Sequence, residues 1–312
     1  MRSKTLWEAE TFMRNETKGL LITLAGALVF TPDALLIRLA ATDPFTLAAA
    51  RAVPAAIVLL AGMFLVHGFA MVHEFLRLGR WGLIAGALQG ASTVLFCFAI
   101  SNTSAANALL IFACMPLIAA LIGWAVLGET VRPATWVAIF VAMTGIMIVA
   151  SGSLGSGGVF GDAMALANAL FTALFYVIAR HRSDLNFIPA NVLGFVIGAL
   201  ISAPFVELGP LEPAQWVWLI LGGCIVLPGA IALFTLGLRY LPAAEVALIG
   251  LLEVVLGPLL VWFILQEKVP QNTIIGGTVL LSALVFHFGM SLLRPAARRA
   301  QGFETHAPGG RV

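Results

Sequence analysis

Charged side chains are scarce in this sequence. Only 10% of its 312 residues are Asp, Glu, Lys or Arg, 61% are hydrophobic, and the mean hydropathy is +1.02. Soluble domains carry about 25% charged residues, so the composition excludes a soluble globular protein and predicts a chain that crosses the lipid bilayer many times. The net charge of +2 is too small to indicate a nucleic-acid partner.

Residue patterns that would support catalysis are missing as well. The three cysteines, Cys97, Cys114 and Cys224, lie in apolar segments and lack the spacing of a metal site. The sequence contains no phosphate-binding P-loop, no Gly-rich dinucleotide loop and no nucleophile elbow. These absences exclude an ATPase within the chain. We therefore predict no enzymatic activity, no metal and no cofactor.

Long apolar runs, in contrast, fill most of the chain. A helix needs about 20 apolar residues to span a bilayer, so we predict an all-α polytopic membrane protein with ten transmembrane helices. The predicted spans are 18–38, 44–66, 79–100, 103–126, 132–151, 158–181, 187–206, 213–238, 242–266 and 270–293.

The spans divide the chain into four regions. Residues 1–17 are polar and lack the cleavage site of a signal peptide, so we predict a cytoplasmic N-terminal segment. Two five-helix units follow, at 18–151 and 158–293, with a run of Gly and Ser between them. Residues 294–312 are predicted to be a disordered cytoplasmic tail.

The sequences of the two units indicate a duplication. Shifted back by 138 residues, the ninth span aligns without a gap on the fourth. The identities include Ala243, Ala244, Leu248, Ile249, Trp262, Glu267 and Val269, which fall on Ala105, Ala106, Leu110, Ile111, Trp124, Glu129 and Val131. A unit of five crossings enters the membrane the opposite way up when it is repeated, so the repeats are predicted to be inverted. Inverted repeats are a signature of secondary transporters.

The distribution of Lys and Arg predicts the orientation. If the N-terminus is inside, 14 of the 17 basic residues lie in inner segments, whereas the outer loop 207–212 carries Glu207 and Glu212 and no base. Cytoplasmic loops are enriched in basic residues. We therefore predict a multi-pass protein of the cell inner membrane with both termini in the cytoplasm.

Several segments resemble a known family. The run from Ala105 to Leu110, followed by Met115-Pro116 and Leu127-Gly128-Glu129, is similar to helices four and five of EamA-type transporters in the drug/metabolite transporter superfamily. The second copy, from Ala243 onward, resembles the same module. Arg51 looks like an arginine often found early in that family's second helix.

The resemblance implies a fold and an activity. It implies ten helices in two inverted repeats, a central cavity and alternating access. It also implies movement of small organic metabolites, often amino acids or drugs, and often outward. The protein is expected to act as a monomer or a homodimer within the lipid bilayer.

Two charged residues fall inside the first two spans. Asp33 lies roughly 7–8 Å, and Arg51 roughly 10 Å, from the outer ends of their helices at 1.5 Å per residue. The spans are neighbours in sequence, so we predict that Asp33 and Arg51 pair at the outer edge of the cavity. The alternative is a purely structural ion pair that keeps Arg51 in the membrane.

Three polar residues from different spans fall near the membrane midplane: Gln89, Asn168 and Glu253. Transporter sites lie at this depth, between the repeats, so we predict that the three line the substrate site. Glu253 would bind a substrate amine or carry a coupling proton, because an acid at this depth is costly to keep. The alternative for the two amides is a role in holding helices together.

Other residues carry weaker predictions. Asn107 and Glu245 are partners at the 138-residue spacing and are candidate cavity-mouth groups, or polar residues tolerated near the interface. Tyr176, one of two tyrosines, is a candidate for stacking on a substrate. Pro116 and Pro258 lie in the equivalent fourth and ninth spans, so we predict kinks and hinges there.

Three glycines, Gly82, Gly86 and Gly90, repeat every four residues along the third span. On a helix they form one flat stripe, which permits close contact with a neighbouring helix. We predict that this stripe serves packing.

Taken together, these patterns predict a secondary transporter. Its substrate is predicted to be a small amino acid-like metabolite, zwitterionic or cationic, which it exports by alternating access. A passive channel, an intramembrane enzyme and a non-transporting sensor are the alternatives. A channel would need a continuous polar lining, an enzyme would need clustered catalytic groups, and a sensor would need a partner-binding domain.

Overall fold

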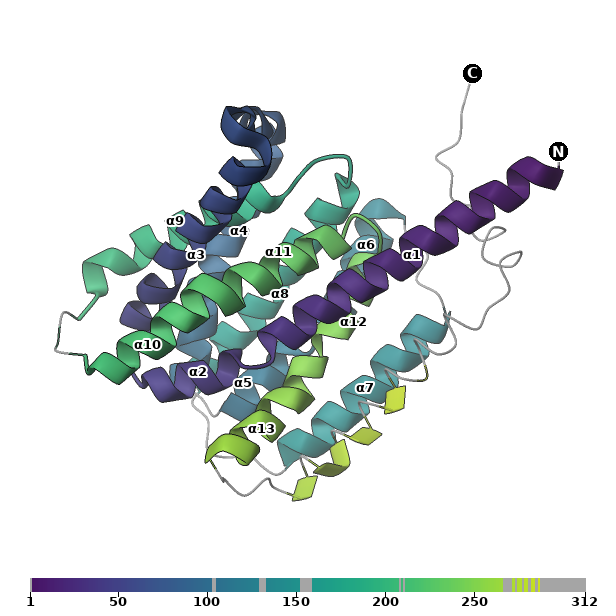
Figure 1. The fold of residues 1–312 in the computed structure, drawn as a ribbon. Helices are drawn as coiled ribbons and strands as arrows, with labels where there is room; N and C mark the ends of the chain where they lie inside the picture. Colours follow the sequence, from purple (N-terminus) through teal and green to yellow (C-terminus); the bar gives the residue numbers. More distant parts are fainter. Residues whose placement is uncertain are drawn as a thin grey trace.

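The structure is a computed structural model that describes residues 2–102, 105–128, 133–151, 159–207, 209 and 211–265, together with isolated residues between 271 and 286. Within these ranges, the side chains described begin at Asn15, and those of Asn107 and Pro258 are not among them. All secondary structure in the described part is helical (Figure 1).

The helices follow one another closely along the chain. Their bounds are α1 (Arg2–Phe30), α2 (Asp33–Ala40), α3 (Pro44–His67), α4 (Met71–Asn102), α5 (Ala105–Phe112), α6 (Met115–Leu127), α7 (Pro133–Ser151), α8 (Val159–His181), α9 (Ile188–Ser202), α10 (Pro213–Leu221), α11 (Leu227–Gly237), α12 (Ala243–Gly250) and α13 (Leu252–Leu265). Two short 3₁₀ helices, η1 (Gly68–Ala70) and η2 (Ala203–Phe205), and one π-helix, η3 (Gly222–Val226), join or extend them.

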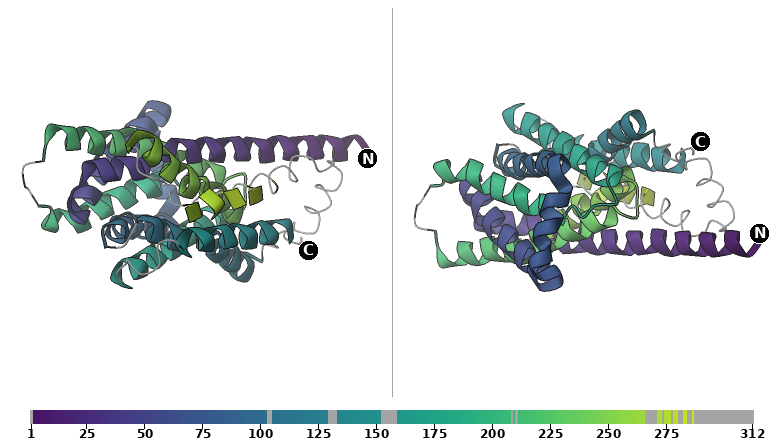
Figure 2. Two further views of the ribbon diagram at one scale, coloured as in Figure 1. Left: turned by 90° about the horizontal axis from the view of Figure 1, so that it is seen from below. Right: turned by 90° about the horizontal axis from the view of Figure 1, so that it is seen from above.

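In the described ranges, each of the first nine predicted spans coincides with one helix or with two or three consecutive helices. Among the described residues, five helical runs are long and apolar enough to cross a membrane, and one of them, Pro44–Asn102, covers two predicted spans. The tenth predicted span lies mostly, and the predicted tail entirely, outside the described residues. The predicted N-terminal segment is helical from Arg2 and continuous with the first span, so α1 extends beyond the other helices (Figure 2).

The fourth and ninth spans are both broken, and at the same place in the repeat. The fourth is interrupted between Phe112 and Met115, and the ninth at Leu251. With the 138-residue shift, Ala113 corresponds to Leu251. Discontinuous helices at equivalent positions of two repeats are typical of transporter binding sites.

The prolines relate differently to these two breaks. Pro116 stands in the first turn of α6, directly after the break, where its missing N–H costs no hydrogen bond. Pro258 lies within α13, several residues past the break at Leu251. The interruption of the ninth span therefore lies nearer the cavity than the kink that we predicted at Pro258.

Two glycines of the predicted stripe, Gly86 and Gly90, pack against α9, whereas Gly82 lies against Leu78 of its own helix. A Cβ atom on Gly86 would lie 2.9 Å from Leu193, and one on Gly90 would lie 2.7 Å from the carbonyl oxygen of Gly194. Residue numbers rise together along both helices at this contact, so α4 and α9 run parallel. A larger side chain at Gly90 would therefore require α9 to shift.

We expect Gly90→Ala to destabilise the protein by about 1–3 kcal/mol, the usual cost of overpacking a tight interior contact. The added methyl group would collide with backbone of α9, which cannot move as a side-chain end can. Gly62→Ala is the matched control, because a Cβ there meets nothing within 4 Å. The thermal unfolding midpoint of detergent-purified protein measures both. Equal midpoints for Gly90→Ala and wild type would contradict the packing.

A second close contact joins α1 to α11 and the segment after it. Gly19 lies against Tyr240 and Leu241, and Gly26 lies against Leu233. Here residue numbers rise along one helix as they fall along the other, so α1 and α11 run antiparallel. The first helix of the first half therefore packs against the third span of the second half.

One end of the bundle is basic. The Trp81 and His181 rings lie 6.0 Å apart, which places Arg80 near the end of α8. Arg180 donates hydrogen bonds of 3.5 Å to the carbonyl oxygens of Leu238 and Arg239. The Lys18 ammonium lies 5.2 Å from the centre of the Tyr240 ring.

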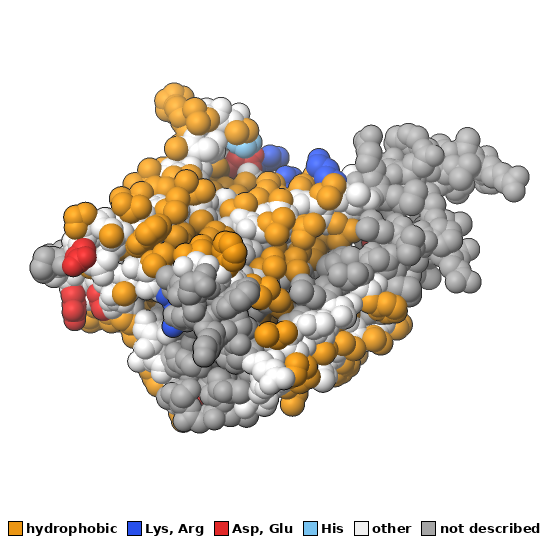
Figure 3. Space-filling model, turned by 60° about the horizontal axis from the view of Figure 1, so that its bottom comes forward, with side chains coloured by type: hydrophobic (Ala, Val, Ile, Leu, Met, Phe, Trp, Pro, Cys, Tyr) orange, Lys and Arg blue, Asp and Glu red, His pale blue; other side chains and the backbone are white. Residues whose placement is uncertain are grey.

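The other end is mainly acidic. The Asp43 carboxylate caps α3, and the backbone N–H of Glu207 donates to Thr46 beside it, at 3.2 Å. Glu212 caps α10, close to Ala40, and Arg38 is a basic residue in the same region. Figure 3 shows a group of acidic side chains at the left edge of the molecule.

Candidate functional site

A cavity of about 90 Å³ lies between the two halves of the chain. Helices α1, α3, α4, α5 and α6 line it from the first half, and α8, α11, α12 and α13 line it from the second. Both helix breaks reach it, through Phe112 and Met115 on one side and Gly250 and Leu251 on the other. The volume is small beside the roughly 300–1,000 Å³ of pockets for drug-sized ligands.

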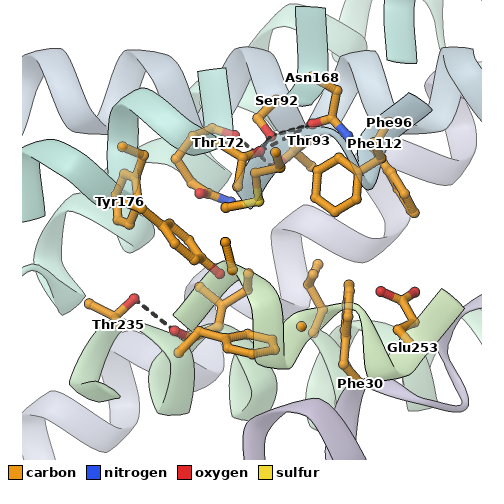
Figure 4. Close-up of a pocket in the computed structure, with 18 of the residues that line it drawn as sticks. Phe30, Ser92, Thr93, Phe96, Phe112, Asn168, Thr172, Tyr176, Thr235 and Glu253 are labelled. Carbon is orange, nitrogen blue, oxygen red and sulfur yellow. Dashed lines mark hydrogen bonds between the residues drawn. The ribbon is translucent and has the colours of Figure 1, made fainter. Parts of the chain in front are cut away.

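The lining combines polar and aromatic side chains. Figure 4 shows many of them around the cavity. The polar residues are Arg51, Gln89, Ser92, Thr93, Asn168, Thr172, Tyr176, Thr235 and Glu253, and the phenylalanines are Phe30, Phe96, Phe112, Phe175 and Phe234.

Asp33 and Arg51 form the predicted ion pair. Asp33 is the first residue of α2, directly after the interruption of the first span, and Arg51 lies on α3. The guanidinium of Arg51 donates to Asp33 Oδ1, and the two side chains are 5% and 0% exposed. Arg51 lines the cavity, whereas Asp33 lies behind it and is not part of the lining. The positive charge of Arg51 at the cavity wall is therefore balanced by the carboxylate of Asp33.

The backbone around Arg51 is shaped by two glycines that the sequence analysis missed. Gly222 and Gly223 begin the π-helix η3. A Cβ on Gly223 would lie 2.9 Å from the carbonyl oxygen of Arg51, and one on Gly222 would lie 3.7 Å from its Nε. The Gly-Gly pair lets the eighth span pass directly over Arg51. Such π-turns inside helices are frequent at functional sites.

Glu253 stands at the break in the ninth span. It lies in the first turn of α13, two residues after Leu251, and is 3% exposed. Its Oε1 has no hydrogen-bond partner among the described residues. Figure 4 shows the carboxylate at the edge of the cavity, turned toward it. The positive end of the α13 dipole favours an acid here, but a buried oxygen without a partner still costs about 1–3 kcal/mol.

Asn168 belongs to a polar cluster that joins α8 to α4. Ser92 Oγ donates to Asn168 Oδ1 at 2.6 Å and lies 2.8 Å from Thr172 Oγ1. Thr172 also donates to Asn168 Oδ1, at 3.4 Å. The amide oxygen therefore holds two helices together, while the amide nitrogen takes part in none of the hydrogen bonds between described residues. Its two N–H groups are donors that a ligand can use.

The aromatic residues form a lining shared by both halves. Phe30 and Phe234 meet edge to face with their ring centres 6.3 Å apart. Phe96 and Phe112 are likewise 6.3 Å apart. Phe175 and Tyr176 follow one another on α8, with centres at 6.2 Å. The faces and edges of these rings give the cavity a mostly apolar wall with a few polar positions.

The comparisons with known proteins agree with this architecture. The profile of the EamA-like transporter family matches residues 17–151 and, a second time, residues 159–289. The chain belongs to the EamA-like transporter family. The two matched segments of this EamA-like chain correspond to the two halves that enclose the cavity. The family match and the apolar helices make it a multi-pass membrane protein of the transporter class.

The fold is also found among solved structures, of which 29 chains match. One, described only as a crystal structure of a protein, has a TM-score of 0.74 over 90% of this EamA-like chain and 100% of its own length. Its sequence identity is 18%, so the likeness concerns the fold alone. None of the curated proteins compared with the sequence matches it.

The structure brings five predicted site residues of this EamA-like transporter to one cavity: Arg51, Gln89, Asn168, Tyr176 and Glu253. They come from α3 and α4 in the first half of the chain and from α8 and α13 in the second. That Gln89, Asn168 and Glu253 line one cavity agrees with the similar depth predicted for them. Their roles in binding a substrate stay predictions.

Two other predicted residues, Glu245 and Pro116, are not part of the cavity lining. Glu245 is buried in the first turn of α12 and is not among the lining residues. Pro116 is buried beside Met115, which does line the cavity. The side chains of Asn107 and Pro258 lie outside the described residues, so their predicted roles are not tested.

Proposed function

We propose that this EamA-like protein is a secondary transporter for a small amino acid-like zwitterion or cation. The observation that carries the proposal is Glu253. It is a buried carboxylate with an oxygen that lacks a partner among the described residues, at a helix break, facing a cavity shared by both halves. A carboxylate in such a position marks a binding or proton site by default.

The charges of the cavity favour a positively charged group on the substrate. Arg51 is already paired with Asp33, so the remaining charge at the wall is that of Glu253. A substrate amine would complete the hydrogen bonds of Glu253 and neutralise it. A substrate carboxylate would find donors in the amide nitrogen of Asn168 and the side chain of Gln89 across the cavity.

The aromatic wall favours an apolar body on the same substrate. Phe30, Phe96 and Phe112 would contact aliphatic or aromatic groups, and their rings also attract a nearby cation. The small volume of about 90 Å³ excludes a bulky ligand in this conformation. The best-fitting class is a small amine-bearing metabolite with an apolar side chain.

The proposed mechanism is alternating access between two inverted five-helix repeats. The parallel contact of α4 with α9 and the antiparallel contact of α1 with α11 both fit a chain that reverses direction at each of ten crossings. In such a chain, equivalent helices of the two repeats point in opposite directions. The equivalent breaks at Ala113 and Leu251 would allow the half-helices to move around the cavity.

The proposed orientation puts the basic end, with Lys18, Arg80 and Arg180, in the cytoplasm, as the positive-inside rule requires. Both termini are then cytoplasmic, in the cell inner membrane. Export is the proposed direction, driven by the substrate gradient or by exchange for a proton carried on Glu253.

Counterflow in proteoliposomes tests the proposal. A thermal-shift screen of purified protein against amino acids, polyamines and nucleosides would first select a ligand, and that ligand would then be loaded on one side. A carrier accelerates uptake of labelled ligand when unlabelled ligand is trapped inside. Flux without this acceleration would indicate a passive channel, and binding without flux would indicate a sensor.

We expect Asn168→Ala to raise the KM for transport about tenfold, the loss of roughly one hydrogen bond to the substrate. The same change breaks the Ser92 contact, so a parallel fall in thermal midpoint is expected. Thr144→Ala is the control, because this exposed hydroxyl bonds to the Phe140 carbonyl of its own helix and to no other residue that the structure describes. A lower midpoint with an unchanged KM would assign Asn168 to packing alone.

A further inference from the structure

The connection between α3 and α4 departs from the bundle. Gly68 and Gly79 bracket it, with φ angles of 55° and 48°, in the left-handed region that favours glycine. Between them lie η1 and the first two turns of α4, through Leu78. In Figure 1 this dark blue segment projects at the top of the molecule. We call residues 68–80 the projecting segment.

The projecting segment has one side against the bundle. Met71 and Phe75 pack on the cluster that contains Val192 and Phe195 of α9. Leu78 is buried and contributes to the largest core cluster. The segment is therefore held in place by apolar contacts and is not a loose loop.

A second side is apolar but exposed. Phe69, Val72 and Leu76 are 83%, 51% and 71% exposed. Val72 and Leu76 are four residues apart on α4, so they share one face of the helix. Exposure of this face to water would be unfavourable, because large apolar side chains are more stable when they are removed from water.

A third side is basic. His73 and Arg77 are exposed and also four residues apart, so they lie together beside the apolar face. Arg80 follows directly after Gly79, and its guanidinium carbon lies 5.4 Å from the Trp81 ring centre. The acid of the segment, Glu74, is half-buried on the side toward the bundle. The exposed charges of this side are therefore positive.

The neighbourhood of the segment is basic too. The Trp81 ring contacts His181 at the end of α8, close to Arg180 and Arg182. Asp184 is the nearby acid, and it is engaged by Arg182 at 3.0 Å, a contact that lowers the pKa of Asp184. The projecting segment thus lies at the basic end of the membrane bundle.

We propose that the projecting segment lies in the headgroup layer at the basic end of the bundle and binds anionic phospholipid. Acyl chains would cover Phe69, Val72 and Leu76, and the lipid phosphate would be held by Arg77 and Arg80. Interfacial helices of this kind combine an apolar face with Lys or Arg beside it. The segment follows a membrane-spanning helix directly, so the bilayer is the apolar surface within its reach.

Trp81 supports the same depth. Tryptophan is enriched at the level of the headgroups, where its ring is half apolar and half polar. A docking site for a soluble protein would instead expose the apolar face to water, beyond the depth of the headgroups. The inference is independent of the substrate and of transport itself.

Titration with lipid tests the charge side of the proposal. Phosphatidylglycerol, added to protein in neutral detergent, should raise the thermal midpoint at lower concentrations than phosphatidylcholine does. The double variant Arg77→Gln/Arg80→Gln should weaken the apparent affinity for phosphatidylglycerol about 30-fold, roughly fivefold for each charge. Arg182→Gln, at the same end but paired with Asp184, should leave the affinity unchanged. Equal effects of the two lipids, or an unchanged affinity in the double variant, would overturn the proposal.

A spin label tests the apolar side. The label would be placed on Leu76→Cys in vesicles, with the signal from wild-type Cys97, Cys114 and Cys224 subtracted. Dissolved oxygen, which concentrates in lipid, should relax this label more than a water-soluble nickel chelate does. A label on Glu212→Cys, exposed at the acidic end, should show the reverse. A nickel-dominated signal at residue 76 would mean that the face meets water, and the proposal would fail.

Discussion

Glu253→Gln is expected to lower the transport rate about 30-fold or more and to remove its pH dependence. A hydrogen bond to a charged group contributes about 1.5–3 kcal/mol, and glutamine can neither form an ion pair with an amine nor carry a proton. Wild-type transport should vary with pH, because an anionic and a neutral Glu253 present different charges to the substrate. Initial rates in proteoliposomes over a range of pH measure both effects.

The same substitution should not destabilise the protein. Glu253 keeps a buried oxygen without a hydrogen-bond partner among the described residues, and glutamine removes a charge that is costly to bury. An unchanged or higher thermal midpoint together with lost transport would be the signature of a residue retained for function. Transport by Glu253→Gln at the wild-type rate and pH dependence would exclude the coupling role.

Glu245→Gln is the matched comparison. Glu245 is also a buried acid in the first turn of a half-helix, but it does not line the cavity. Its replacement should leave the pH dependence of transport intact. If both variants lost pH dependence, the effect could not be assigned to the cavity.

Arg51→Gln is expected to destabilise the protein by about 3–5 kcal/mol, because it leaves the buried Asp33 carboxylate without compensation. Asp33→Asn should also lower the folded yield, since it leaves the buried guanidinium of Arg51 without its carboxylate partner. The double variant Asp33→Asn/Arg51→Gln removes both charges and should recover part of the loss. Thermal midpoints and folded yields of the four proteins form a double-mutant cycle.

Arg182→Gln controls for the loss of any arginine. Its pair with Asp184 is exposed to water, where ion pairs contribute little. If Arg51→Gln left yield and transport at the wild-type level, the ion pair would be unimportant for both folding and function. Loss of transport in a double variant that folds well would instead show that transport itself needs the charged pair, beyond its role in folding.

The site could be predicted in part from positions along the chain. Gln89, Asn168 and Glu253 interrupt apolar runs at similar depth, and depth follows from counting residues along a helix. Asp33 and Arg51 fall near the same end of two consecutive spans, which is enough to predict a pair. In each case the signal is a polar side chain where the bilayer permits few.

Other parts of the site gave no such signal. Ser92 and Thr172 are ordinary in membrane helices, and nothing in the sequence shows that they face each other. The phenylalanines, 21 in all, could equally face lipid or the cavity. Gly222 and Gly223 were not recognised, because their importance depends on which helix crosses them.

By itself, the sequence determined the membrane class, the approximate spans, the duplication and the residues whose charge is costly in lipid. These properties depend on local hydropathy and on the one-dimensional spacing of the chain. The tertiary structure decided where the fourth and ninth spans break, how each helix is rotated and which side chains meet at the cavity. Rotation and breaks are set by packing between helices, as at Gly90 against Gly194 and Gly223 against Arg51, and packing depends on partners that are distant in sequence.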